Sequence, residues 1–292
     1  MDAEDPYKGC WDRYDRAVTH RQEALEVWND FVRGDDAYSV ELYMHPKGEG
    51  VGGGTLRVSQ DRPIPALLPI LFGEYFYNLR AALDYVVYTT AIIDNGWRDP
   101  PPGESVLQYP VCETPETWRN SAFHVQPLTA RHRSWIELVQ PYVGGEDPKV
   151  RGIYWLNHFA RLDRHRELRI VGGYLAERNP IVRVKAPAVV AFDPMDGEVF
   201  VEKDAVIASF TVTPWTQGDE VQANPQMGID IELKDFFLGR PPDAGWLRRP
   251  IRDRLFLIES VVEGEIGRFE YDAVRRTRCR YLNTDWEGFQ RA

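Results

Sequence analysis

The sequence contains little cysteine, and the cysteines that it has are dispersed. Only Cys10, Cys112 and Cys279 occur in 292 residues, far apart and odd in number. A disulfide framework uses an even set of cysteines, and a structural zinc site uses paired ligands at short spacing. Because neither pattern is present, the sequence predicts free thiols in a reducing compartment. We expect neither a bound metal nor another cofactor.

Two further features are missing. No run of about 18 uncharged apolar residues occurs, so no membrane span is predicted. The first residues, MDAEDPYKGC, are acidic and lack the apolar core of a secretory signal. An excess of positive charge is also absent, since 35 Lys and Arg against 45 Asp and Glu give a formal net charge of −10. This charge argues against broad contact with nucleic-acid phosphates, and we expect a cytoplasmic protein.

Apolar residues, in contrast, are abundant: the chain is 43% hydrophobic and 12% aromatic, which is enough for a sizeable core. The longest apolar-rich segment covers residues 64–93. Leucines and valines recur there at helical spacing, which predicts a helix from near Ala66 to near Asn95-Gly96. Since aromatic residues fill most of its remaining positions, we expect other helices to surround it.

The rest of the chain is predicted to be mixed. Helical periodicity and strand-like alternation predict further elements, namely helices over 6–34, 129–143, 150–171 and 248–271, and strands over 38–45 and 55–60. The glycine-rich segment 48–54 predicts a hairpin loop, because neither a Lys-Ser/Thr pair nor a helix follows it, as a phosphate-binding loop requires. Residues 181–234 are β-rich, with a hairpin signal at Asp196-Gly197.

These patterns predict an α+β protein, with a helical bundle as core and a smaller antiparallel β-sheet beside it. Residues 1–178 are expected to form a mainly helical domain that carries a β-hairpin near 38–60. Residues 179–292 are expected to form the sheet and a closing helix, which packs on the bundle because its apolar stripe needs a partner.

The central helix carries the first polar cluster: Glu74, Asn78, Arg80 and Asp84. Glu74 and Asn78 share one face of the helix, and Arg80 and Asp84 share another. A charge on so apolar a helix needs a partner, because burying it alone is costly. Arg80 and Asp84 are therefore interpreted either as an internal ion pair that joins helices or as part of a binding site.

The segment 157–168 carries the second polar cluster: Asn157, Arg161, Asp163, His165 and Arg166. A histidine beside arginines suits acid–base chemistry on a phosphate or another anion. A solvated charged face is the alternative. His158 and His165 are seven residues apart but lack a third ligand, so metal binding is not favoured.

Several segments, in order, resemble a family of uncharacterised bacterial proteins: GEYFYNLRAALDYVVY, LQYP, VQPY and LNHFARLDRHREL. Members of that family carry an NLRSALDHL-like run followed by a DKHR-like run. The resemblance covers about residues 60–175 and implies a cytoplasmic bacterial protein but no activity. This chain departs from the family pattern at Arg164, where lysine is usual, and at Tyr85, where histidine is usual.

A looser likeness is to HEPN domains, which are helical bundles that include ribonucleases. Their motif is an arginine followed by four to six residues and a histidine, and RNSAFH (119–124) fits it. Arg13 with His20 and Arg151 with His158 fit it as well, and matches of this kind arise readily by chance in a chain with many arginines.

Two functions follow as hypotheses. The favoured one is a ligand- or partner-binding helical protein with a buried polar network, whose binding candidates are Glu74, Asn78, Asp84, Asn157 and Asp163. The alternative is a HEPN-like ribonuclease or nucleotide-acting enzyme, with His165 as acid or base and Arg80 or Arg166 holding phosphate. The expected partner is a small anionic ligand or RNA, and exposed aromatic residues permit a homodimer.

Overall fold

The structure is a computed structural model, and it shows an α+β protein in which all strand pairs are antiparallel. It describes residues 5–34, 36–144, 147–178, 180–185, 187–194, 201, 204–224, 227–234, 236 and 249–282. Its contacts divide the chain into two units. The helical unit comprises Met1–Gln22, Leu71–Leu168 and Gly239–Ala292, and the sheet unit comprises Glu23–Ile70 and Arg169–Leu238.

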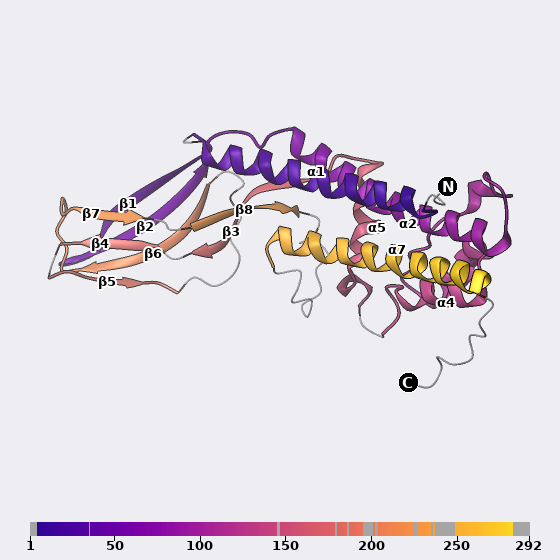
Figure 1. Cartoon of the computed structure of the whole chain (residues 1–292). Coiled ribbons are helices and arrows are strands. Elements are labelled where there is room, and N and C mark those ends of the chain that lie inside the picture. The colour runs from indigo at the N-terminus through magenta and orange to yellow at the C-terminus, as the bar shows by residue number, and fades with distance from the viewer. Residues whose placement is uncertain are drawn as a thin grey trace. The chain divides into compact units, whose positions relative to one another are not determined.

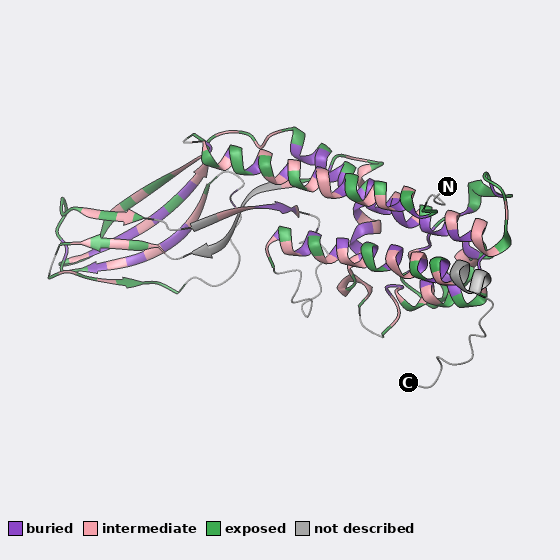
Figure 2. Cartoon of the chain, viewed as in Figure 1, coloured by how far each residue is buried: buried purple, intermediate pink, exposed green. Residues whose placement is uncertain are grey.

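The chain contains long helices and several short ones (Figure 1). The α-helices are α1 (Lys8–Arg33), α2 (Leu67–Asn95), α3 (Pro115–Ser121), α4 (Ala130–Leu138), α5 (Gly152–Asp163) and α7 (Ile251–Leu282). Short 3-10 turns are η1 (Glu104–Val106), η2 (Ala122–Val125) and η3 (Pro148–Val150). Buried and exposed positions alternate along α1 and α7 (Figure 2), as expected of amphipathic helices that each cover a core with one face.

Helix α2 is the most buried helix of the helical unit, and its bounds match those predicted. Phe76 of α2 stacks on Phe159 of α5, with ring centroids 4.6 Å apart. The Tyr75 hydroxyl donates a hydrogen bond of 3.0 Å to the backbone oxygen of Leu255 on α7. Both α5 and α7 therefore pack against α2, where Phe72, Tyr75 and Phe76 are buried, whereas Tyr77 and Tyr85 of the same helix are exposed.

Helix α5 is shorter than predicted, and this corrects the expected helix over 150–171. It ends at Asp163, and the backbone N–H groups of His165 and Arg166 both donate to the oxygen of Leu162 at 2.9 Å. The run after Leu162 is charged on all sides, so a continued helix has no apolar face to bury. The chain instead turns and enters strand β3 (Ile170–Arg178).

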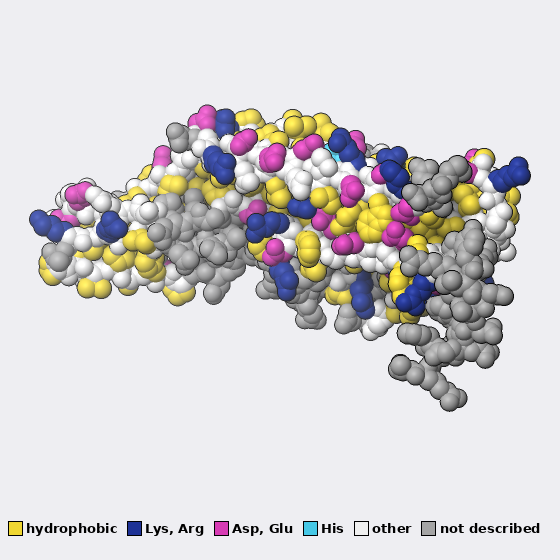
Figure 3. All heavy atoms as spheres, in the orientation of Figure 1, with side chains coloured by type: hydrophobic (Ala, Val, Ile, Leu, Met, Phe, Trp, Pro, Cys, Tyr) yellow, Lys and Arg dark blue, Asp and Glu magenta, His cyan; other side chains and the backbone are white. Residues whose placement is uncertain are grey.

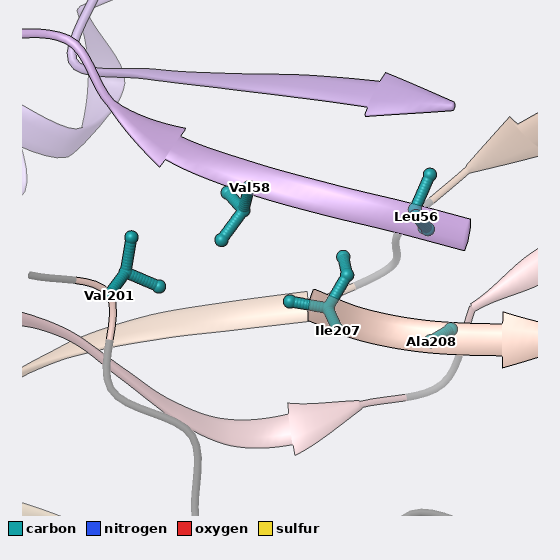
Figure 4. Close-up of a cluster of buried hydrophobic side chains, with 5 residues drawn as sticks. All are labelled: Leu56, Val58, Val201, Ile207 and Ala208. Carbon is teal, nitrogen blue, oxygen red and sulfur yellow. The ribbon is translucent and has the colours of Figure 1, made fainter. Parts of the chain in front are cut away.

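The sheet unit is built from three antiparallel sheets. A four-stranded sheet has the order β1-β2-β6-β5, from β1 (Tyr38–Gly48), β2 (Val51–Gln60), β6 (Asp204–Thr213) and β5 (Val189–Phe192). Two-stranded sheets pair β3 with β8 (Met227–Leu233), and β4 (Ile181–Val184) with β7 (Val221–Asn224). Part of the core lies between β2, β6 and the segment at residue 201, and contains Leu56, Val58, Val201, Ile207 and Ala208 (Figure 4).

The predicted hairpin over 38–60 is present, but its turn is tighter than expected. Only Glu49 and Gly50 separate the strands, and Gly50 has a φ of 66°, which favours glycine. The following glycines, 52–54, belong to β2 and are buried. A side-chain carbon at Gly52 would overlap the ring of Trp215, and one at Gly54 would overlap the ring of Phe210. These glycines therefore let neighbouring rings lie directly on the strand.

Both units are discontinuous in sequence, whereas the sequence analysis placed one boundary after residue 178. The reason is that β2 pairs with β6, from Gly52 with Val212 to Ser59 with Asp204, which draws the hairpin into the sheet unit. Helix α7 belongs to the helical unit and is longer than predicted. The hairpin signal at Asp196-Gly197 lies outside the described residues. Within the described part of the chain, no helix is long and apolar enough to cross a bilayer.

Candidate functional site

Arg80 and Asp84 form the ion pair that their spacing predicts, and together they clamp an extended segment. Arg80 Nη1 lies 2.7 Å from Asp84 Oδ1. Arg80 Nη2 donates to the backbone oxygen of Tyr109 at 2.5 Å, and the Tyr109 N–H donates to Asp84 Oδ1 at 2.8 Å. The pair thus satisfies both backbone polar groups of Tyr109, as a neighbouring strand would. These contacts make Arg80 and Asp84 structural partners of the connecting segment.

Glu74, Asn78 and Asp163 lie in one region where α1, α2 and α5 meet. Arg13 Nη1 on α1 donates to Asn78 Oδ1 at 3.2 Å, and Asn78 Nδ2 donates to the backbone oxygen of Glu74 at 2.8 Å. The Asp163 carboxylate lies directly against Gly73, where a side-chain carbon would overlap it. Burial raises the pKa of Asp163, and the negative charge of Glu74 raises it further.

His165 is exposed in the turn after α5, not on a helix face. Arg161 is exposed, whereas Asn157 and Arg166 are half-buried. Among the described residues, no hydrogen bond or ion pair joins the His165 side chain to Arg80 or to its neighbours. His158 remains on α5, half-buried, with its ring stacked on Tyr154 at 5.9 Å. In the described part of the chain, no three His, Cys, Asp or Glu side chains converge as metal ligands.

The HEPN-like match RNSAFH begins on α3 and ends in η2. Its His124 is half-buried, and Nδ1 lies 2.6 Å from the backbone oxygen of Val106. Arg119 is exposed, near the end of α3. The histidine ring therefore has a local backbone partner in the segment at η1.

The helical unit contains a pocket of about 490 Å³ between α4 and the C-terminal half of α7, and we call it the arginine pocket. Its lining consists of cationic, aromatic and small residues: Arg131, Trp135, Gly267, Arg268, Tyr271, Asp272 and Arg275. A volume of this size is typical of sites for small ligands. Three guanidinium groups around one pocket give it a chemistry that favours anions.

Aromatic rings hold the guanidinium groups of the arginine pocket in place. The Arg131 and Arg268 guanidinium carbons lie 4.7 and 5.6 Å from the centre of the Trp135 ring. The Arg275 guanidinium lies 4.2 Å from the centre of the Tyr271 ring. A guanidinium whose face rests on a ring keeps its N–H edges available for oxygen acceptors. The rings therefore pre-organise the cations and lower the entropy lost when a ligand binds.

Two carboxylates partly balance these charges. Arg131 Nη2 lies 3.2 Å from Asp272 Oδ1, and Arg268 forms an ion pair with Glu265. Burial lowers the pKa of Arg268, and its Nε has no hydrogen-bond partner among the described residues. An anion in the pocket would stabilise the charged form of Arg268.

Behind the arginine pocket, His132 fixes the position of Asp272. The buried imidazole of His132 lies between two carboxylates, with Nδ1 2.7 Å from Asp94 Oδ2 and Nε2 3.2 Å from Asp272 Oδ2. Asp94 also accepts a hydrogen bond of 2.9 Å from the backbone N–H of Thr129, which precedes α4. The wall of the pocket is thus connected to the end of α2 through charged hydrogen bonds.

Sequence reasoning missed this pocket. The signal was present as spacing: Arg131 and Trp135 are four apart on α4, and Arg268, Tyr271 and Arg275 recur at three and four on α7. The sequence alone does not show that these faces of α4 and α7 meet.

The face drawn in Figure 3 shows basic side chains interspersed with acidic ones. This view and the net charge of −10 agree with a protein whose cationic groups gather only locally. Comparisons of the chain with protein-family models, curated proteins and solved structures gave no match.

Proposed function

We propose that this chain is a binding protein for a small anionic ligand, which it holds in the arginine pocket between α4 and α7. The observation that supports this function is the convergence of Arg131, Arg268 and Arg275 on one pocket, with their guanidinium groups against Trp135 and Tyr271. Arginine forks bind phosphate and carboxylate oxygens in pairs, and an organised set of them favours a compact ligand with several oxygens.

Binding rather than catalysis is favoured because the candidate catalytic residues have other partners or lie apart. The Arg80 guanidinium is 7% exposed and is taken up by Asp84 and the backbone of Tyr109. A substrate phosphate would have to displace both. One observation favours the alternative, a HEPN-like ribonuclease using His165: this side chain is exposed beside Arg166, where a substrate can reach it.

Two glycines of α7 provide a matched test of the pocket. Gly267 lines the pocket and Gly264 does not, and a side-chain carbon at either position meets nothing within 4 Å. Gly267→Leu should fill the pocket, whereas Gly264→Leu should leave it open. Both changes should preserve the helix, because leucine is a better helix former than glycine by roughly 0.5–1 kcal/mol.

The measurement is isothermal titration of the full chain with inorganic pyrophosphate, inorganic phosphate and citrate at constant ionic strength. We expect wild type and Gly264→Leu to bind at least one of these anions and Gly267→Leu to lose it. Affinity should fall as salt is raised, since the contacts are ionic. Equal binding by the two variants, or no binding of any of the three anions by wild type, overturns the proposed function.

A further inference from the structure

The sheet unit contains a second pocket, of about 520 Å³, beside the β4–β7 pair and the end of β6. The buried Val212 and Trp215 form an apolar floor, and Pro187 and Ala188 add to the apolar lining. Its rim carries charges of both signs. None of these residues belongs to the arginine pocket, so this site stands independently of the function proposed above.

Trp215 is one of the buried residues that line this pocket, together with Val212. Its ring rests on Gly52, and its backbone N–H donates to the Gly50 oxygen at 2.8 Å, so its position is fixed by β2 and by the hairpin turn. The residue is only 7% exposed. Its indole Nε1 is buried and has no hydrogen-bond partner among the described residues. Because this nitrogen is buried, a ligand in the pocket meets the indole ring rather than its N–H group.

The charged residues on the rim differ in whether they already have hydrogen-bond or ion-pair partners. Asp219 Oδ2 accepts the Thr216 N–H at 2.7 Å, and Glu220 Oε1 accepts the Gln222 side-chain amide at 2.7 Å. Both acids therefore already have donors. Arg183 and Lys185 are exposed, and within the described part of the chain neither forms an ion pair. The cations are the charges that remain open to a ligand.

We propose that this pocket binds a small organic monocarboxylate with an apolar body. The carboxylate lies between Arg183 and Lys185, where charge-assisted hydrogen bonds hold it. The apolar body covers Trp215 and Val212, which excludes water from the floor. A cationic ligand of the same shape is disfavoured, because Asp219 and Glu220 already accept hydrogen bonds whereas Arg183 and Lys185 form no ion pair within the described part of the chain.

The test uses three carboxylates, benzoate, phenylacetate and hexanoate, with benzylamine as a cation similar in size to benzoate. Binding to the full chain is measured by saturation-transfer NMR and by isothermal titration. We expect at least one carboxylate to bind and benzylamine not to bind. Benzylamine binding as well as the acids, or no binding of any of the three acids, overturns the proposal.

Paired variants locate the ligand. Arg183→Gln with Lys185→Gln should weaken carboxylate binding by about tenfold or more, the loss expected for a charge-assisted hydrogen bond. Arg57→Gln with Lys47→Gln removes the same residue types and the same charge from the same unit, outside the pocket lining, and should change affinity less than about twofold. If carboxylate affinity falls equally in the two double variants, the loss reflects the change in overall charge, and the proposed site is refuted.

The Gly267→Leu variant separates the two proposals. It fills the arginine pocket only, so carboxylate binding should persist in it. If Gly267→Leu abolishes binding of the monocarboxylate, the ligand occupies the helical unit, and the sheet-unit site is wrong while the proposed function stands. If pyrophosphate binding fails everywhere but benzoate still responds to Arg183→Gln with Lys185→Gln, the proposed function is wrong and this site stands.

Discussion

Replacing Asp84 by alanine should destabilise the helical unit by more than its surface position suggests. The side chain is 34% exposed, yet one oxygen, Oδ1, accepts from both Arg80 and the backbone of Tyr109. Removing it breaks two hydrogen bonds to a charged carboxylate, each of about 1.5–3 kcal/mol. Water reaches the partly exposed site and replaces some of the lost hydrogen bonding. We therefore expect the free energy of unfolding to fall by about 2–3 kcal/mol.

The control is an ion pair of the same spacing on the surface. Lys8 and Asp12 lie 2.6 Å apart, four residues apart on α1, and their side chains are 58% and 59% exposed. Asp12→Ala should lower the free energy of unfolding by less than about 0.5 kcal/mol. Both variants and wild type are compared by urea unfolding followed by far-ultraviolet circular dichroism.

Hydrogen exchange gives a local measure of the same clamp. The Tyr109 amide should exchange faster in Asp84→Ala, because its acceptor is gone, and should be unchanged in Asp12→Ala. If Asp84→Ala and Asp12→Ala destabilise equally, and the Tyr109 amide keeps its protection, the clamp does not stabilise the fold and our reasoning is refuted.

Three further predictions concern α2 and α5. Gly73→Ala should destabilise by roughly 1–3 kcal/mol, because its side chain meets Asp163, whereas Gly264→Ala, with nothing within 4 Å, should stabilise; thermal melts distinguish them. The raised pKa of Asp163 means that this carboxyl binds a proton more tightly in the folded protein than in the unfolded one, so the free energy of unfolding falls as pH rises through the folded pKa. Asp163→Asn should therefore be more stable than wild type at pH 7. The difference, measured by urea unfolding, should vanish below the ordinary carboxyl pKa of 3.8. His165→Ala should leave the melting temperature unchanged, since the side chain is exposed. If the ribonuclease alternative holds, wild type should cleave mixed RNA and His165→Ala should not. Equal cleavage by the two proteins would show that His165 has no catalytic role.

The sequence predicted the long helices well because their signal is local. The apolar face of α2 and the stripe of α7 repeat over many turns, so the period is unmistakable even without knowledge of the fold. The pair Arg80 and Asp84 was also predictable, since side chains four apart on one helix must meet. Its true partner, the backbone of Tyr109, was not predictable, because the connection after α2 has no periodic pattern.

The end of α5 shows where local reasoning fails. The expected helix over 150–171 contains both His158 and His165, but α5 ends at Asp163 and the chain then enters strand β3, which pairs with β8, a segment far along the chain. The arginine pocket was missed for a similar reason. Each of its two faces is readable in the sequence, but their meeting depends on the packing of α4 against α7, which single-helix periodicity does not encode.

The pairing of β2 with β6 also bears on how this protein is synthesised. Leu56 faces Ala208 across the sheet, so the first strands leave the ribosome long before their neighbour exists. Folding of the helical unit is also delayed until α7 has been made, because α7 is needed to cover Tyr75 of α2. Neither unit can therefore complete its folding during translation of the N-terminal part of the chain. The glycine-rich edge of β2, which relies on rings from later residues, is thus a nascent surface that remains uncovered until most of the chain has been made.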